Sequence, residues 1–386
     1  MGEPRGKGLQ EWPRPRDLST SAPFPGPLPA STRVPMQSLS VAPSPAIPPP
    51  SAAGAEAAPR PIATWQRELA EAIRDPAELC RLLGLDADVA VAAQTAMGDF
   101  PLLVPRGFVA RMRPGDPRDP LLLQVLPTAA ERVPAAGFSA DPLDEAATLA
   151  APGLLQKYPG RGLLLVAGGC AVNCRYCFRR QFPYAESGVS QAGQADAVDA
   201  IVADGSLTEV ILSGGDPLLL DDARLADLVG RLDAIPHLRR LRIHSRLPVV
   251  LPSRVTDGLI ATLQATRLTT VVVIHANHAS ELDATVEDGV RRLASAGALV
   301  LNQAVLLAAV NDSLDAQRAL AERLVEIGVV PYYLHLLDRV AGAAHFEAAE
   351  EWASALHRGL RESLPGYAVP RLVRARPGAR AKDWVL

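Results

Sequence analysis

The amino-acid sequence predicts an α/β fold in which short apolar strands alternate with helices. Two observations support this prediction: six apolar, β-branched segments recur from residue 162 onward, and helical segments of a dozen or more residues separate them. Strands joined in this way form a parallel sheet, and their functional residues gather at the strands' C-terminal ends. We therefore expect an incomplete or complete β/α barrel with its site on one rim.

The order of strands and polar groups along the chain agrees with this expectation. A cysteine-rich loop follows the first strand, and a Gly-Gly-Asp turn follows the second. Ser245 and Arg246 end the third strand, His275 ends the fourth, and Asp338 ends the sixth. The predicted strands are GLLLVA at 162–167, EVILS at 209–213, LRIHS at 241–245, TVVVIH at 270–275, LVLNQAVLL at 299–307 and YYLHLL at 332–337.

Helices are expected before the barrel. In TWQRELAEAI, at 64–73, apolar residues recur every four positions as far as Ile73, which predicts one helix. Asp75 and Pro76 supply the N-cap and the first-turn proline of a second helix. Cys80 lies beside leucines in that second helix, so we expect it to be a small core residue and not a ligand.

Composition limits the domain organisation. The chain has 386 residues and is 48% hydrophobic, enough for a large core. Residues 1–61 hold 15 of the 35 prolines without periodic apolar residues, so we expect a disordered extension. The remaining chain divides into a helical accessory region at 62–150, the barrel at 151–345 and a C-terminal segment at 346–386.

Charge and hydropathy exclude several classes of function. A formal net charge of −3 and a pI near 6.2 give no excess of basic residues with which to bind nucleic acid. No apolar run approaches the roughly 20 residues needed to cross a bilayer. Four cysteines are too few for a disulfide framework in a chain of this length, which indicates a reducing, cytoplasmic location. A small-molecule substrate is therefore expected.

Three of the four cysteines lie within eight residues of the loop GGCAVNCRYCFRR. Cys170, Cys174 and Cys177 have the spacing C-x3-C-x2-C, and thiolates bind zinc, copper(I) and iron–sulfur clusters. A structural zinc site needs a fourth ligand, and no histidine is near in the sequence. Three cysteines on a [4Fe-4S] cubane leave one iron open to a substrate or cofactor, whereas a packing role suits the polar neighbours Asn173 and Arg175 poorly.

The loop resembles the radical S-adenosylmethionine (SAM) superfamily, in which C-x3-C-x2-C follows the first strand of a six-stranded partial β/α barrel. The resemblance implies that Cys170, Cys174 and Cys177 hold a [4Fe-4S] cluster. The open iron would bind SAM, and an electron from the cluster would cleave SAM to a 5'-deoxyadenosyl radical. LSGGDPL at 212–218 then resembles the loop that binds the SAM ammonium through Gly214, Gly215 and Asp216. A glycine turn alone would be a weak signal, because strand-to-helix turns often carry glycine for steric reasons.

Further motifs resemble the lysine 2,3-aminomutase branch of that superfamily from about residue 64 onward. They are KYPGRGLLL, CRYCFRRQFPY, SGGDPL, RLPVVLPSRVT, HANHASEL, NQAVLLAAVND and PYYLHLLDRVAGAAHF. The greatest similarity is to the short form that makes β-lysine for the modification of elongation factor P, which stops soon after its cofactor lysine, as this chain does. His275 and Gln303 match SAM-contacting positions of that branch.

The branch also uses pyridoxal 5'-phosphate (PLP), which requires a Schiff-base lysine. The chain has only three lysines, Lys7, Lys157 and Lys382. Lys382, in RPGARAKDW, matches the family lysine that follows a Pro-Gly turn, although an arbitrary lysine near a chain end is usually solvated. Tyr158 and Arg161 match residues that hold the PLP phosphate, and Lys157 replaces an arginine of longer relatives.

The same resemblance assigns the substrate contacts. Arg179 matches the arginine that holds the substrate's α-carboxylate through a forked contact, whereas the alternative is a surface arginine. Asp338 matches a carboxylate that receives the distant ammonium of lysine. Longer relatives carry a second acid where this chain has Ala375, flanked by Arg374 and Arg376.

These matches imply an isomerase that converts L-lysine to β-lysine and takes electrons from a flavodoxin or ferredoxin. Its product would serve elongation factor P and its ligase. Three alternatives stay open from the residues: the same reaction on another amino acid, such as arginine, glutamate or β-lysine; a non-catalytic zinc module; and a degenerate radical enzyme that binds SAM without aminomutase activity.

Overall fold

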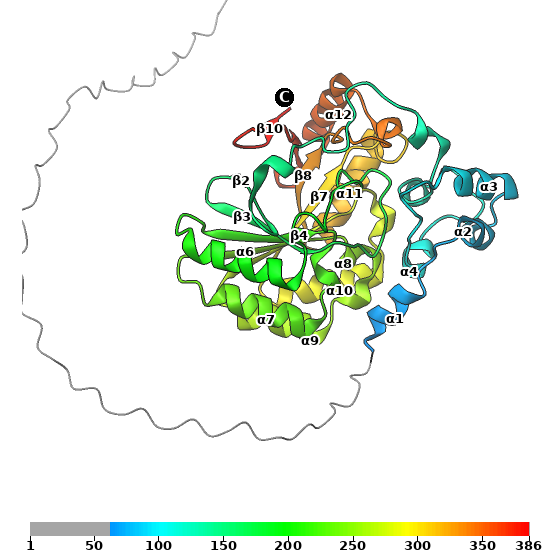
Figure 1. Cartoon of the computed structure of the whole chain (residues 1–386). Helices are drawn as coiled ribbons and strands as arrows, with labels where there is room; N and C mark the ends of the chain where they lie inside the picture. The colour runs from blue at the N-terminus through cyan, green and yellow to red at the C-terminus, as the bar shows by residue number, and fades with distance from the viewer. Residues whose placement is uncertain (1–61, 386) are drawn as a thin grey trace, which may run out of the picture. The chain divides into compact units, whose positions relative to one another are not determined.

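A ten-stranded sheet organises residues 62–385, the part of the chain that the computed structural model describes. The predicted disordered extension at 1–61 lies outside the described residues. Neighbouring strands follow chain order (Figure 1). Their bounds are β1 Leu149–Ala151, β2 Leu154–Tyr158, β3 Arg161–Ala167, β4 Glu209–Gly214, β5 Arg240–Ser245, β6 Thr269–Ile274, β7 Leu299–Val305, β8 Val330–His335, β9 Arg371–Arg374 and β10 Asp383–Trp384.

The six predicted strands are β3 to β8, and they pair in parallel throughout. The short strand β9 adds a further parallel strand beside β8, while β1, β2 and β10 pair antiparallel at the two ends of the sheet. The strand order ends at β1 and β10 without a pairing between them in residues 62–385. The predicted barrel is therefore confirmed, in its incomplete form.

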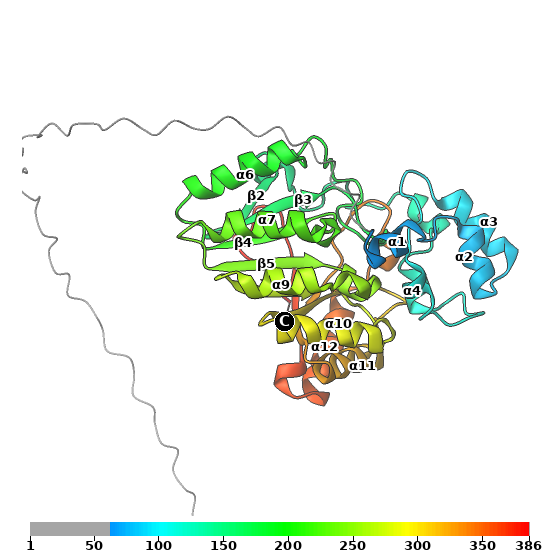
Figure 2. The same cartoon turned by 90° about the horizontal axis from the view of Figure 1, so that it is seen from below.

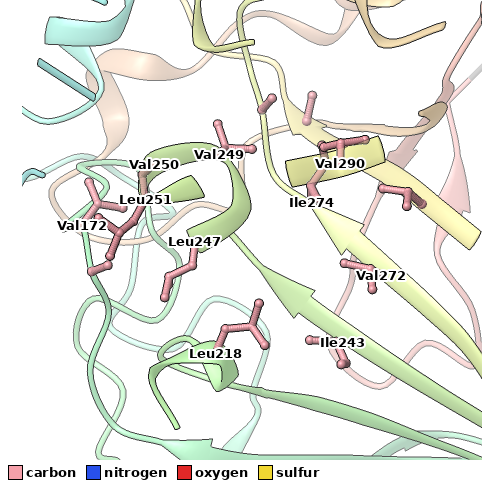
Figure 3. Packing of buried hydrophobic residues seen from close by; sticks show 14 of the residues in the cluster. Val172, Leu218, Ile243, Leu247, Val249, Val250, Leu251, Val272, Ile274 and Val290 are labelled. Atoms are coloured by element: carbon pink, nitrogen blue, oxygen red, sulfur yellow. The ribbon is translucent and has the colours of Figure 1, made fainter. Parts of the chain in front are cut away.

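The two faces of the sheet differ in chemistry. Leu164, Leu212, Ile243 and Val272 lie side by side in register on the outer face and are buried against the helices. Figure 3 shows Ile243 and Val272 on neighbouring strands, with Val290 of α10 nearby. Alternation places the intervening side chains of each strand on the inner face, which carries several polar groups at the strands' C-terminal ends.

The helices after β3 cover the outer face (Figure 2). Most of the long ones begin at a residue whose side chain accepts a backbone N–H of the first turn, which satisfies one free donor at each helix start. These N-caps are Ser190, Asp221, Thr256, Asp283 and Ser313. The helices are α6 Gln191–Ala203, α7 Asp222–Asp233, α8 Leu247–Val250, α9 Asp257–Ala265, α10 Ala284–Ser295, α11 Leu314–Glu326 and α12 Glu350–Ser363.

The region before the barrel is mostly helical, as predicted, with one correction. The first helix ends at Ala70, and Ile73 instead forms an isolated antiparallel bridge with Val104. Asp75 caps the second helix as expected. Cys80, in the same helix, is 2% exposed and packs in the hydrophobic core, as expected. The helices are α1 Thr64–Ala70, α2 Pro76–Leu83, α3 Ala87–Ala96, α4 Arg106–Val109 and α5 Pro120–Leu123.

The predicted domain boundaries at residues 150 and 345 stay a prediction.

No helix within residues 62–385 has the length and hydropathy needed to cross a membrane.

Candidate active site

The cysteine loop begins directly after β3 and is held by the helical region. The backbone N–H of Asn173 donates to the Leu103 carbonyl at 3.0 Å, and that of Arg175 donates to the Gln124 carbonyl at 2.9 Å. The guanidinium of Arg175 is buried and forms two hydrogen bonds to Glu131, at 2.8 and 2.5 Å. The accessory region therefore fixes the path of the loop through backbone contacts and a buried ion pair.

The three thiols lie in an environment that disfavours free thiolates. Burial raises the pKa of the Cys170 thiol well above its ordinary value, and the nearby Cys177 and Asp216 raise it further. Burial also raises the pKa of the Cys177 thiol to about 11, with an added contribution from Cys174. Iron ions bound to the thiolates would balance their mutual repulsion, so the site fits a cationic centre.

The grouping of metal-binding side chains bears on the choice between a cluster and a single metal ion. Within residues 62–385, no three or more His, Cys, Asp or Glu side chains are grouped as one metal ion would require. In a cubane each thiolate binds a different iron atom, so three cysteines need not converge on one point. Cys170, Cys174 and Cys177 therefore remain the predicted ligands of a cluster, and their assignment stays a prediction.

The glycine turn after β4 packs directly against the start of the cysteine loop. Gly214 has a φ of +123°, and a Cβ there would lie 2.4 Å from the carbonyl oxygen of Ala167. A Cβ on Gly215 would lie 1.9 Å from the carbonyl oxygen of Gly169. Only glycine permits this approach, which joins the two loops into one surface.

Asp216 links the glycine turn to the end of β5. Its carboxylate accepts four hydrogen bonds: from the Leu218 N–H and the Ser245 hydroxyl on one oxygen, and from the Arg246 and Leu247 N–H groups on the other. An ionised carboxylate has about four lone-pair sites, so none is left for a ligand. Burial raises the pKa of Asp216 to about 6. This side chain therefore fixes the end of β5, and the predicted contact between Asp216 and the SAM ammonium stays a prediction.

Two histidines on the inner face have nitrogens available for a ligand. His244 lies on β5 and His275 directly follows β6, with ring centroids 5.7 Å apart, and the Nε2 atom of each is buried without a hydrogen-bond partner among the described residues. Burial lowers the pKa of His275 to about 4, so the ring is neutral near pH 7. Gln303 lies one strand further along the same face. Buried polar atoms normally have partners, so these fit a bound cofactor.

Lys382 reaches the same inner face from the C-terminal segment. Its Nζ atom lies 3.3 Å from Nε2 of His335 and 5.5 Å from the ring centre of Tyr333, both on β8. Burial lowers the pKa of Lys382 to about 8, although Asp338 opposes the shift. A Schiff-base lysine must be neutral to react, so the environment fits the predicted PLP attachment.

The predicted phosphate-binding group lies between β2 and β3. The guanidinium of Arg161 lies 5.5 Å from the ring centre of Tyr158, and the turn between the two strands joins them. Lys157 is largely buried, with its Nζ atom 4.0 Å from Glu145. Burial lowers the pKa of Lys157, and Glu145 opposes this effect. Two cationic groups and a phenol therefore border this part of the site.

Arg179 is buried, and Glu145 fills its forked face. The Nε and Nη2 atoms of Arg179 donate to the two carboxylate oxygens of Glu145 at 2.7 and 3.0 Å. Its Nη1 atom donates to the Ser213 hydroxyl and to the Gly214 carbonyl. Arg179 therefore lies in the site as predicted and is not a surface residue, but it already has a bidentate partner.

Asp338 and Ala375 line the same cavity, whose volume is about 730 Å³. Burial raises the pKa of Asp338 to about 6, while Lys382 and Lys157 lower it in part. Other charged residues around the cavity are Arg339, Glu347, Glu350, Glu351, Arg374 and Arg376. Ala375, which stands where longer relatives carry a second acid, thus borders the same cavity as Asp338.

Several residues of the site were not predicted from the sequence. Glu145, Glu281 and His335 contact predicted groups from 34 to 47 positions away along the chain. Glu145 and Glu281 are buried carboxylates, and acidic side chains are rarely buried unless they pair with a cation. Their arginine partners become evident only in the structure. No local spacing signals such pairs.

Comparisons with known proteins agree with this geometry. Residues 158–237 match the family described as a 4Fe-4S single cluster domain. The chain is 47% identical to the L-lysine 2,3-aminomutase of Escherichia coli (strain K12), over 82% of this chain and 93% of the relative. It is 45% identical to the enzyme of the same name from Haemophilus influenzae, over 80% and 92%. With the enzyme of that name from Clostridium subterminale, identity is 33% over 83% and 77%.

The chain belongs to the lysine 2,3-aminomutase family. It is therefore an enzyme, an isomerase of the intramolecular aminotransferase type. The cofactors of this class are a [4Fe-4S] cluster, SAM and PLP. Among solved structures, a radical SAM methyltransferase from Sphaerobacter thermophilus has a TM-score of 0.40 at 20% identity, over 58% of this chain and 69% of that chain.

Proposed function

We propose that this enzyme converts L-lysine to β-lysine by moving the α-amino group to C3 in exchange for a hydrogen atom. The observation that carries the proposal is the set of charges around Asp338, which comprises Lys382, Lys157, Glu145 and Arg179. Arg179, Lys157 and Glu145 together have one net positive charge, which complements one carboxylate. Asp338 adds a separate negative charge, which complements a distant ammonium.

Lys382 is the proposed attachment point for PLP. Its lowered pKa leaves much of the amine neutral near pH 8, and the neutral form is the nucleophile. His335, next to it, is also neutral, because burial and Lys382 lower its pKa well below the ordinary value. Tyr158 and Arg161 are proposed to hold the phosphate, and Lys157 adds charge without the bidentate geometry of arginine.

Cys170, Cys174 and Cys177 are proposed to hold the cluster, with His275, Gln303 and the backbone at Gly214 and Gly215 next to SAM. When bound, the cluster and SAM supply a hydrogen-abstracting radical, and PLP supplies a conjugated ring that spreads the unpaired electron. The residues of the inner face exclude water from this space and keep the reacting groups close together. The cysteine loop and the glycine turn contribute the rigid wall.

Arg179 is proposed to bind the substrate's α-carboxylate from within its pair with Glu145. One N–H of its Nη2 atom has no partner among the described residues, and Lys157 lies near the same carboxylate. A second anion can therefore share the two cations. Glu145 keeps Arg179 in one orientation, which lowers the entropic cost of binding.

The cavity beside Asp338 supports a long cationic side chain despite Ala375. Arg339 pairs with Glu347 at 2.6 Å, and Arg374 pairs with Glu350 at 2.7 Å. Of the four acids lining the cavity, Asp338 and Glu351 thus have no ion pair in residues 62–385. We assign Asp338 to the substrate's ε-ammonium.

A second candidate substrate is glutamate, because three arginines line this cavity at Arg339, Arg374 and Arg376. Reconstituted enzyme assayed with lysine, arginine and glutamate separates the two candidates. The proposal expects the highest kcat/KM with lysine. A higher value with glutamate would overturn the assignment of Asp338.

The cellular role is proposed from the resemblance to the short form. β-Lysine would be ligated to elongation factor P, and a flavodoxin or ferredoxin in the reducing cytoplasm would supply electrons. The mass of elongation factor P from host cells with and without this gene tests the proposal, and equal masses would contradict it.

A further inference from the structure

A buried arginine outside the predicted site touches one of the cysteines. Arg246 follows β5 directly and is 5% exposed. Its Nη1 atom donates a hydrogen bond to the sulfur of Cys174 at 2.7 Å. The backbone N–H of Arg246 donates to Asp216, which holds the residue in place. The Gly-Gly-Asp turn is therefore linked to the cysteine loop through Arg246.

The remaining contacts fix the direction of the guanidinium. Its Nη2 atom donates to Gln124 at 2.8 Å and to Glu281 at 3.0 Å. The rings of Phe108 and Tyr176 have centres 5.5 and 5.6 Å from its carbon atom. The Nη1 atom of the guanidinium therefore faces the sulfur, and the Nη2 atom faces the balancing carboxylate of Glu281.

Glu281 does not depend on Arg246 for all of its partners. Its Oε1 atom accepts from the backbone N–H groups of Asn277 and His278 at 2.9 and 3.1 Å, and from the side chain of Gln124 at 3.1 Å. Gln124, Arg246 and Glu281, which form these contacts, come from three separate segments of the chain. An ion pair between Arg246 and Glu281 that only stabilised the fold would not require the Nη1 atom of Arg246 to contact Cys174.

We infer that Arg246 tunes the reduction potential of the iron–sulfur cluster through the positive charge and the hydrogen bond that it presents to Cys174. A cluster gains negative charge on reduction, so a cation and an N–H donor at a ligand sulfur stabilise the reduced state more than the oxidised state. Arg246 thus raises the potential and makes the cluster easier to reduce. The inference rests on cluster binding by the three cysteines and is independent of the amino acid that the enzyme rearranges.

The test is an anaerobic redox titration of the reconstituted cluster, followed by electron paramagnetic resonance without SAM or substrate. Arg246→Met, with iron and sulfide content equal to the wild type, is expected to shift the midpoint potential to a more negative value. Arg246→Lys keeps the charge and should shift it less. An unchanged midpoint potential in Arg246→Met would overturn the inference.

The matched control is Arg254→Lys. Arg254 is also buried and paired with an acid, Asp222 at 2.8 Å, but contacts no cysteine. The midpoint potential of the cluster in Arg254→Lys should equal that of the wild type. If Arg246→Met assembles no cluster, Arg246→Gln decides by the same titration, because it lacks the charge but still donates a hydrogen bond. A negative shift supports the inference, and a wild-type value overturns it.

Discussion

The amine of Lys382 lies 3.3 Å from Nε2 of His335, where β8 ends on the inner face of the barrel. Two basic groups at this distance cannot both be charged in a buried site without a large cost. The pKa of His335 is lowered by burial and by Lys382, and that of Lys382 is lowered to about 8 by burial. The pair is therefore arranged to present a neutral amine at mildly alkaline pH.

Lys382→Ala should abolish the visible absorbance of the PLP Schiff base. Lys382 is the proposed attachment point, and no other lysine of the described residues lies beside His335. Spectra of the PLP-loaded variant and the wild type check this result. Lys157→Ala is the control, and it should keep the band with weaker PLP affinity. An unchanged band in Lys382→Ala would move the attachment elsewhere.

Asp338→Asn should raise KM for lysine by about 10- to 100-fold, because a hydrogen bond to a charged group contributes about 1.5–3 kcal/mol. In the wild type the carboxyl has a pKa of about 6, raised by burial, so it is ionised above that pH and neutral below it. kcat/KM should therefore fall as pH drops through about 6, and the variant should lack this limb.

Glu347→Gln is the matched control, because Glu347 lines the same cavity but is paired with Arg339. Its KM should change much less than that of Asp338→Asn. Equal effects of both variants would contradict the assignment of Asp338 to the substrate.

Asp216→Asn should lower the free energy of unfolding by about 1–3 kcal/mol, because an amide cannot accept the four hydrogen bonds of the carboxylate. Chemical denaturation of the variant and the wild type measures the difference. A stable variant with weakened SAM binding would instead restore the role expected from the sequence.

Serine at Cys170, Cys174 or Cys177 should abolish the cluster and turnover, since each thiolate is the proposed ligand of a separate iron. Iron and sulfide analysis after reconstitution measures the loss. Cys80→Ser is the control, because Cys80 lies in the core of α2 and should leave the iron content unchanged. A triple cysteine variant with full activity would contradict cluster chemistry altogether.

The strands could be predicted because each central strand is a short apolar run with turn residues at its ends. β3 to β8 begin within two residues of their predicted starts. The short strands β1, β9 and β10 depend on a neighbour for their pairing and lack this signal. Ile73 continues the helical spacing of α1 but pairs with Val104, so tertiary contact overrides the local pattern.

The cysteine loop could be recognised as a candidate site for a related reason, because its three thiols are close together in the sequence. The groups that surround it are not. Arg246 touches Cys174 across 72 positions, and Glu145 touches Arg179 across 34. Such contacts arise from the register of neighbouring strands and loops, which no local spacing encodes.

The central claim is tested most directly with L-lysine labelled with 15N at its α-amino group. The protein is reconstituted anaerobically with iron, sulfide and PLP, then given SAM, dithionite and the labelled substrate. Mass spectrometry should find β-lysine with the 15N label at C3. Cleavage of SAM without labelled β-lysine would contradict lysine as the substrate, with Ala375 as the first position to examine.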